Sequence, residues 1–203
     1  MTKRKMRNIL VFLFSIPLVL CAQSGVVGGL NISKKTFKEA KSQTGLYMGL
    51  FQDIRLTSEF YIQPRLLFSL GSTKSTKNNL ETITKHNYLE LHLYASFRLP
   101  LNDKDHFILN IGPSVAQGIS GKNKTYSNWN VIHSRRTFDE IPSFDYGISG
   151  GLGYANKNNA TYFFLDYIYG LKEVRDTSRQ NSKGHSISFR VGLAISLRFF
   201  DWM

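Results

Sequence analysis

The feature that most constrains the fold is a strict alternation of apolar and polar side chains along residues 88–99 and 187–199. In the first segment every second residue from Leu89 to Leu99 is apolar, and the residues between them include Glu90 and Arg98. Successive side chains of a β-strand point to opposite faces, so each segment predicts a strand with one apolar and one polar face. Beyond residue 22 no sustained helical period and no run of 18 apolar residues occurs, which excludes a bundle of membrane-spanning helices.

The same period predicts eight strands, at about residues 25–33, 44–54, 60–70, 87–99, 106–117, 142–154, 161–171 and 185–200. The connections between them alternate between long (34–43, 71–86, 118–141 and 172–184) and short (55–59, 100–105 and 155–160). Outer-membrane barrels have short periplasmic turns and long extracellular loops. The sequence therefore predicts an all-β fold, an eight-stranded antiparallel up-and-down transmembrane β-barrel.

Aromatic residues lie near both ends of these predicted strands. Those next to the short turns are Phe60, Phe97, Phe107, Tyr154, Phe163, Phe199 and Trp202, and those next to the long connections are Phe68, Tyr88, Phe144, Tyr146, Tyr167 and Tyr169. Aromatic girdles at both membrane interfaces are typical of outer-membrane barrels. The alternative for any single residue is that aromatic side chains favour strands in general.

The first 22 residues have the layout of a secretory signal peptide. Four basic residues within the first seven precede an uncharged run from Ile9 to Leu20, which leads to Cys21 and Ala22. The run is shorter than the roughly 20 residues of a membrane-spanning helix, and Leu20 is larger than the side chain expected before a lipidated cysteine. We expect cleavage after Ala22, so that residues 1–22 are a signal peptide and residues 23–203 form an outer-membrane barrel domain.

Charged side chains are distributed differently in the predicted strands and in the connections between them. The formal net charge is +12, and it is +8 without the four basic residues of the leader. The strands carry four acidic and four basic side chains, and an eight-stranded barrel is just wide enough for side chains to fill its interior. We expect Arg65 to lie level with Glu90 and His92, and Asp166 to approach Arg190. The predicted polar network of the lumen consists of Arg65, Glu90, His92, Arg98, Asp145, Asp166, Arg190 and Arg198.

The excess positive charge lies in the long connections, which are predicted to be extracellular. One hypothesis is that these basic loops contact outer-membrane lipid through the phosphates of lipopolysaccharide, and the alternative is a solvated surface without a specific ligand. A protein partner at the loops is a further hypothesis, and the third long loop with Trp129 is the place for it. The candidate contact residues are Lys34, Lys35, Lys38, Lys122, Lys124, Trp129, Arg135 and Arg136. An exported chain without nucleic-acid-binding motifs predicts no nucleic-acid partner.

The sequence predicts no catalytic, cofactor-binding or metal-binding site. Glu90 and His92 point to one face of a strand, but no serine beside them is identifiable from sequence as an activated nucleophile. The pairs of neighbouring His and Ser at His133 and His185 have little specificity, because a catalytic triad is defined by spatial geometry. No nucleophile elbow, phosphate-binding glycine loop or zinc-ligand spacing occurs. The sequence therefore favours a protein that is not an enzyme.

Several short motifs in order resemble the PorT-like outer-membrane β-barrels of Bacteroidota, often called porin-family barrels. They are Gly28-Gly29-Leu30-Asn31, Gly45-Leu46-Tyr47-Met48-Gly49-Leu50-Phe51, Tyr61-Ile62-Gln63-Pro64-Arg65-Leu66-Leu67-Phe68-Ser69, Asn87-Tyr88-Leu89-Glu90-Leu91, Ile111-Gly112-Pro113, Asp145-Tyr146-Gly147, Gly151-Leu152-Gly153-Tyr154 and Tyr167-Ile168-Tyr169-Gly170-Leu171. The resemblance covers nearly the whole mature chain and implies an eight-stranded outer-membrane barrel. One member of that family is an accessory of type IX secretion, but no residue here transfers that role. The C-terminus departs from the family's usual aromatic ending, because Met203 follows Trp202.

Three functional hypotheses remain from the sequence. The first is an outer-membrane barrel with a filled polar lumen and long basic extracellular loops, with a structural or interaction role in adhesion, the envelope or secretion and no open diffusion pore. The second is a soluble exported lipocalin-like binder, in which the apolar faces would enclose a small hydrophobic ligand. The third is a lipid-modifying barrel enzyme with catalytic groups near the outer rim.

Overall fold

The computed structural model describes residues 23–35, 42–77, 80–127, 130–139, 143–156, 160–172, 174–175 and 183–197. These residues are almost entirely strand, and one short 3-10 helix, η2 (Thr137–Asp139), occurs among them. The strands are β1 (Gln23–Lys35), β2 (Gln43–Arg55), β3 (Phe60–Lys77), β4 (Leu80–Pro100), β5 (Asp105–Ser127), β6 (Asn130–Arg136), β7 (Phe144–Asn156), β8 (Thr161–Gly170), β9 (Val174–Arg175), β10 (Lys183–Gly184) and β11 (Ser186–Leu197). No helix within the described part of the chain is long and apolar enough to cross a membrane.

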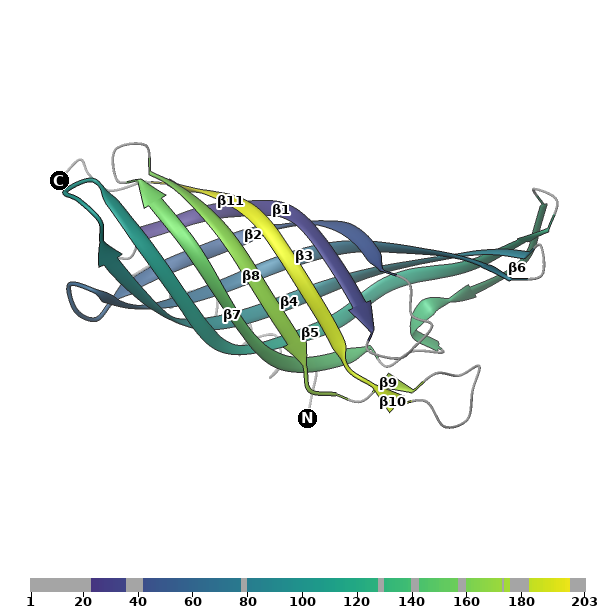
Figure 1. The fold of residues 1–203 in the computed structure, drawn as a ribbon. Coiled ribbons are helices and arrows are strands. Elements are labelled where there is room, and N and C mark those ends of the chain that lie inside the picture. Colours follow the sequence, from purple (N-terminus) through teal and green to yellow (C-terminus); the bar gives the residue numbers. More distant parts are fainter. Residues whose placement is uncertain are drawn as a thin grey trace, which may run out of the picture.

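Eight of these strands close into an antiparallel barrel, as Figure 1 shows. Their order is β4-β3-β2-β1-β11-β8-β7-β5, and β4 also pairs with β5. The ring closes where β1 pairs with β11, from Ser24 opposite Leu197 to Lys35 opposite Ser186. Closure removes the free edges of the sheet, so the backbone groups of the barrel are satisfied without water. The predicted eight-stranded up-and-down barrel is confirmed.

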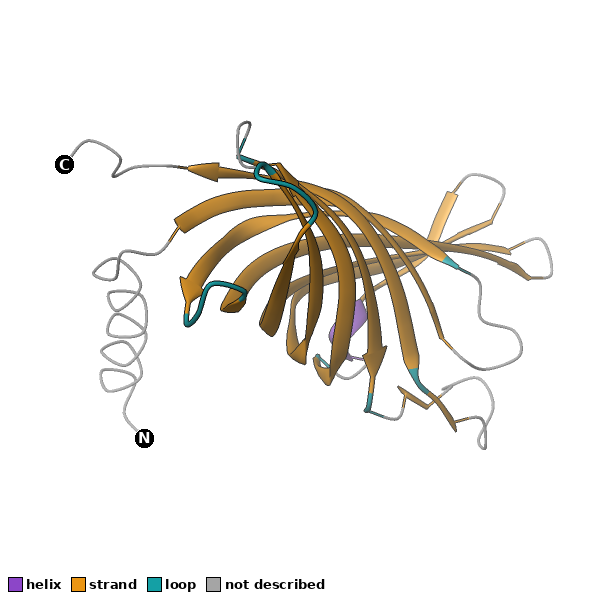
Figure 2. Ribbon diagram, turned by 60° about the vertical axis from the view of Figure 1, so that its left-hand side comes forward, coloured by secondary structure: helices purple, strands orange, loops and turns teal. Residues whose placement is uncertain are grey.

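Two of the connections that the sequence predicted to be long loops are strands instead. β3 and β4 stay paired from Ser72 opposite Lys85 to Lys77 opposite Leu80, within the predicted loop 71–86. β5 continues to Ser127 and pairs with the additional strand β6, within the predicted loop 118–141. The prediction ended each strand where apolar alternation stopped, but a sheet beyond the membrane needs no apolar face. The result is a four-stranded sheet that projects from one end of the barrel, here called the extension (residues 72–77, 80–86, 120–127 and 130–136), visible in Figure 2.

The apolar faces of the strands point away from the barrel. Leu91 and Val191 are 48% and 58% exposed, whereas the neighbouring residues Glu90 and Arg190 are 7% and 3% exposed. This arrangement is the reverse of a soluble protein, in which large apolar side chains are buried. It contradicts the lipocalin-like hypothesis, because the apolar side chains do not line an internal ligand cavity.

The height of the outward apolar surface matches a membrane. On β4 this surface runs from Leu89 to Leu99, which are 42% and 45% exposed. A strand that rises about 3.4 Å per residue and tilts by about 40° covers about 26 Å of membrane thickness over that distance. Outer-membrane barrels have an apolar band about 25 Å tall.

Aromatic side chains pair across neighbouring strands near both edges of this band. At the end with the short turns the rings of Phe60 and Phe97 lie 4.8 Å apart, and at the other end the rings of Tyr167 and Phe189 lie 4.9 Å apart. The sequence suggested Tyr88 for a membrane interface, but Tyr88 lines the interior of the barrel mouth. It lies two residues from Glu90 on β4 and therefore points to the same, inward face.

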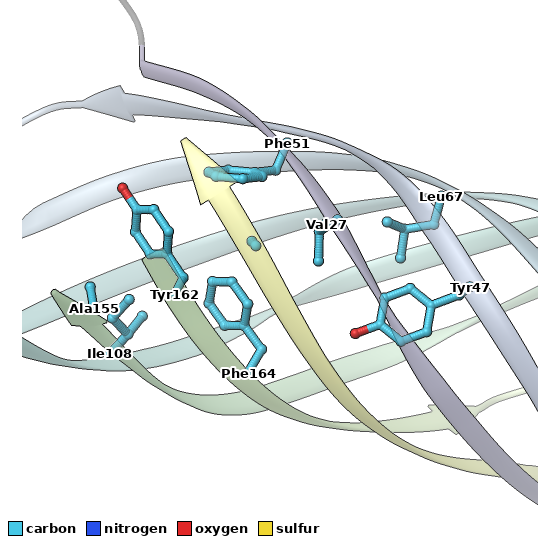
Figure 3. Packing of buried hydrophobic residues seen from close by; sticks show 9 residues of the cluster. Val27, Tyr47, Phe51, Leu67, Ile108, Ala155, Tyr162 and Phe164 are labelled. Atoms are coloured by element: carbon cyan, nitrogen blue, oxygen red, sulfur yellow. The ribbon is translucent and has the colours of Figure 1, made fainter. Parts of the chain in front are cut away.

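The sequence predicted a polar interior, but the interior of the barrel is only partly polar. A cluster of inward apolar and aromatic side chains fills much of it, shown in Figure 3. The ring of Tyr162 stacks on Phe164 at 5.9 Å and meets the edge of Phe51 at 5.4 Å. On β8, Tyr162 and Phe164 alternate with the outward apolar residues Phe163 and Leu165, so the sequence around them lacks a clear polar face.

Candidate functional site

Most residues of the predicted polar network do enter the lumen. Arg65 on β3, Glu90, His92 and Arg98 on β4, Asp166 on β8 and Arg190 on β11 are all buried. They follow from the two-residue period, because each lies between outward apolar neighbours. Asp145 on β7 is half-buried at the barrel mouth, where its carboxylate accepts a hydrogen bond from the Ser186 hydroxyl at 3.0 Å. Arg198 lies outside the described residues.

Two buried ion pairs connect opposite walls of the barrel. The Arg65 guanidinium donates to the Asp166 carboxylate at 2.9 Å, and that of Arg190 donates to both carboxylate oxygens of Glu90 at 2.7 and 2.8 Å. The strands of each pair, β3 with β8 and β4 with β11, lie four positions apart in the ring of eight. Each pair therefore joins directly opposite strands across the lumen.

This arrangement corrects the predicted partners. Arg65 does lie level with His92, and Asp166 does lie opposite Arg190 in the strand register. However, Arg65 binds Asp166 instead of Glu90, and Asp166 binds Arg65 instead of Arg190. The reason is the narrow lumen, in which a long arginine side chain reaches the far wall as readily as its neighbour.

A second cluster joins the network toward the short-turn end of the barrel. Arg98 pairs with the carboxylate of Asp53, which also accepts a hydrogen bond from the Gln63 amide at 2.6 Å. The Gln63 oxygen in turn accepts from Arg65 Nε at 2.8 Å, so both clusters are connected. The sequence pattern placed Asp53 on a strand but did not indicate this role, which depends on three strands meeting in space.

Aromatic rings cover the buried guanidinium groups. Arg65 lies 3.9 Å from the ring centre of Phe164, and Arg98 lies 4.0 Å from that of Tyr61. A cation over an aromatic face is stabilised by the ring quadrupole, and the effect grows when water is excluded. The aromatic cluster of the lumen therefore compensates part of the desolvation of its arginines.

The lumen also contains a Ser-His-Glu arrangement that the sequence did not reveal. His92 Nδ1 lies 3.4 Å from the Ser149 hydroxyl, and His92 Nε2 lies 3.0 Å from Glu90. Ser149 and His92 are 0% exposed, neither lines the two cavities at the ends of the lumen that are described below, and the Ser149 hydroxyl donates to the carbonyl of Gly112 at 3.1 Å. A nucleophile must reach its substrate. We therefore interpret this arrangement as part of the packed core, in agreement with the sequence prediction for Glu90 and His92.

Two cavities flank the packed part of the lumen. One of about 160 Å³ lies at the mouth on the side of the long connections and is lined by Asn31, Tyr88, Asp145 and Arg190 among others. The other, of about 220 Å³, lies at the short-turn end beside Arg98 and Tyr162. They share no lining residue, and side chains that are at most 1% exposed lie in the lumen away from both cavities, namely Arg65, His92, Gln63, Tyr94 and Ile108.

The candidate loop contacts are distributed over both faces of the extension and over β1. Lys34 on β1 is exposed, and Lys122, Lys124 and Arg136 lie on the face of the extension that continues the outer wall of the barrel. Arg135 lies on the opposite face, because neighbouring residues of a strand alternate. The side chain of Lys35 and residues Lys38 and Trp129 lie outside the described part of the chain, as does the side chain of His133.

No group of three or more His, Cys, Asp or Glu side chains within the described ranges is arranged to hold a metal ion. The geometry thus defines a class of protein, the small closed barrel with an apolar outer wall and a packed, charged lumen. A family model described as "Outer membrane protein beta-barrel domain" matches residues 21–176. The chain belongs to this family of outer-membrane β-barrels. No curated protein sequence matches it significantly.

Solved structures of small outer-membrane proteins are similar to this chain. Neisserial surface protein A superposes with a TM-score of 0.50 and 11% identity, over 88% of this chain and 100% of that one. The attachment invasion locus protein Ail of Yersinia pestis gives 0.47 and 12%, over 88% and 100%. The outer membrane enzyme PagL gives 0.39 and 12%, over 87% and 100%. At such identities the likeness concerns the fold alone.

Breaking one cross-lumen ion pair should destabilise the barrel more than removing both partners. Arg65→Met or Asp166→Leu leaves a buried charge without its partner, and we expect each to lower the free energy of unfolding by about 3–5 kcal/mol. The double variant should lose less stability than either single variant, because no buried charge is left without a partner. Urea titration in lipid vesicles, followed by the mobility of unboiled samples, measures all four proteins. As a control, Asp166→Leu with Arg190→Met should show a smaller coupling, and a larger one there would contradict the assigned pairs.

Gly151 should be essential for the position of Asp166, whereas its neighbour Gly150 should not. A Cβ atom at Gly151 would lie 2.1 Å from Asp166 Oδ1, but one at Gly150 would come no closer than 3.6 Å to any atom. We expect Gly151→Ala to lower the urea midpoint clearly and Gly150→Ala to leave it nearly unchanged. Equal midpoints for the two variants would show that the Asp166 carboxylate is not held against β7.

Proposed function

We propose that the chain is exported by a cleaved signal peptide to the bacterial outer membrane, where it acts as a structural or interaction protein and not as a diffusion pore or an enzyme. The observation that carries this proposal is the layer of fully buried side chains between the two cavities of the lumen. A barrel whose interior is filled by ion pairs and aromatic rings offers no continuous water path. The surfaces left for function are then the outer wall and the two ends.

The end with the extension is the better candidate for interaction. In outer-membrane barrels the long connections face the outside of the cell, so this end would be extracellular. Paired strands hold the extension in a defined shape, which favours a specific surface over a mobile loop. Its described cations include Lys85, Lys122, Lys124 and Arg136, so an anionic partner fits best.

The proposal also includes the relationship, partners and role that the sequence predicted. A relationship to the PorT-like barrels of Bacteroidota rests on the short motifs alone, and a role in type IX secretion would need a partner at the extracellular end. Lipopolysaccharide phosphates and an unknown protein are the two proposed partners. An enzymatic role is disfavoured because the Ser-His-Glu arrangement is enclosed in the lumen.

Purified protein in planar lipid bilayers should give no stable channel. Because the lumen is filled at its centre, we expect no conductance steps of a nanosiemens under conditions in which an open 16-stranded porin gives them. The porin serves as the positive control, and the mobility shift between unboiled and boiled samples confirms that the test protein is folded. Reproducible nanosiemens steps from the folded protein would refute the closed lumen.

A further inference from the structure

Three cations form a row across neighbouring strands of the extension. Lys85 on β4 lies opposite Lys122 on β5, which lies opposite Arg136 on β6. All three side chains are exposed. Directly opposite residues of antiparallel strands share a face and have Cβ atoms about 5 Å apart, so the row is about 10 Å long.

The row lies on the face that continues the membrane-facing wall. On β4 the outward residues Leu91 and Leu89 are followed by Asn87 and Lys85, with the same parity. On β5, Lys122 lies on this face because the strand contains a β-bulge. Tyr88 is opposite Gly118 and Asn87 is opposite Ser120, so Ile119 is an extra residue.

The bulge decides where the lysines of β5 point. Before it, odd-numbered residues such as Ile111 and Val115 face outward, and after it even-numbered residues do. Without Ile119 as an extra residue, Lys122 and Lys124 would therefore point to the inner face of the extension. The bulge instead aligns them with the outer wall of the barrel.

The backbone of the row lies just beyond the lipid headgroups, within reach of long cationic side chains. Lys85 precedes Leu89, the outward leucine of β4 nearest the extension, by four residues, or about 10 Å along the membrane normal at a tilt of about 40°. The polar interface of a bilayer extends about 5–8 Å beyond the hydrocarbon on each side. Long lysine and arginine side chains bend toward that layer with their charged ends.

The row lacks a paired carboxylate within the part of the chain that the structure describes. Among the described residues no carboxylate forms an ion pair with Lys85, Lys122 or Arg136. Like charges directly opposite on a sheet destabilise it. An anion bound over the row would remove that repulsion, and a phosphate group accepts hydrogen bonds from several cations at once.

We propose that Lys85, Lys122 and Arg136 form a binding site for the phosphate groups of the glycolipid in the outer leaflet. The proposal rests on the proposed function, since it requires the extension to face the outside of the cell. A lipid is favoured over an acidic protein because the row lies above the apolar band on the same face, where lipids already surround the barrel. Lys124, which lies two residues beyond Lys122 on this face, extends the site away from the membrane.

The experiment compares two variants with equal loss of charge. The full chain, refolded in zwitterionic detergent, is titrated with diphosphoryl lipid A, and bound lipid is quantified after gel filtration. Lys122→Gln with Arg136→Gln removes two cations of the row, whereas Arg55→Gln with Lys104→Gln removes two exposed cations from the short-turn end. Each cation near an anionic lipid surface contributes about a factor of five in affinity. We expect about a 30-fold loss for the row variant and less than a twofold change for the control.

Further probes separate the sources of phosphate. Monophosphoryl lipid A should bind more weakly than the diphosphoryl form, and inorganic phosphate at the same concentration should not displace either one. Equal binding of diphosphoryl lipid A by the wild type and the row variant would overturn the proposal. Row-dependent binding of polyglutamate that lipid A does not displace would overturn it in favour of an acidic protein.

A mobility comparison of unboiled and boiled samples accompanies each titration. A wild-type protein without a heat-modifiable band would contradict the proposed function as well. A folded wild type whose lipid A binding does not depend on the row would contradict this inference alone.

Discussion

Closure of the hydrogen-bonded ring is the constraint on which the rest of the structure depends. A barrel surrounded by lipid cannot leave strand edges open, because unpaired backbone groups have no water to bind in the hydrocarbon. The pairing of β1 with β11 therefore determines the number of strands, and the number of strands determines the width of the lumen. With eight strands, side chains from opposite walls meet. The ion pairs between opposite walls follow from that distance.

The filled lumen pairs the charged side chains that the lipid-facing wall excludes. Charged side chains cannot face the lipid on the apolar wall, so they point inward, where each must find an opposite charge. The pairs Arg65–Asp166 and Arg190–Glu90 meet this requirement by reaching across the lumen, and aromatic rings cover the guanidinium groups. Ser149, His92 and Glu90 are residue types found in catalytic triads, but here they are enclosed in the packed lumen. The proposed function therefore assigns interaction to the outer surface and the ends of the barrel.

The sequence predicted the barrel well, because each transmembrane strand carries its apolar and polar faces locally. Glu90, His92 and Arg190 are inward for that reason alone. Their partners were not predictable, since register places Asp166 beside Arg190 while its ion pair is with Arg65 across the lumen. The extension was missed because its strands have no apolar period. The outward direction of Lys122 depends on the bulge at Ile119, which leaves no signal in a two-residue pattern.

The apolar side chains of the strands face the lipid, and two adjacent residues of β4 test this direction most directly. Leu93 is 47% exposed and points outward, whereas Tyr94 is 1% exposed and points into the lumen. With Trp129 and Trp202 replaced by Phe, single variants Leu93→Trp and Tyr94→Trp can be refolded in vesicles that contain brominated lipids. The account predicts strong quenching of the tryptophan at position 93 and little at position 94. Quenching of the tryptophan at position 94 but not at 93 would mean that the apolar residues face inward, and would contradict the membrane barrel.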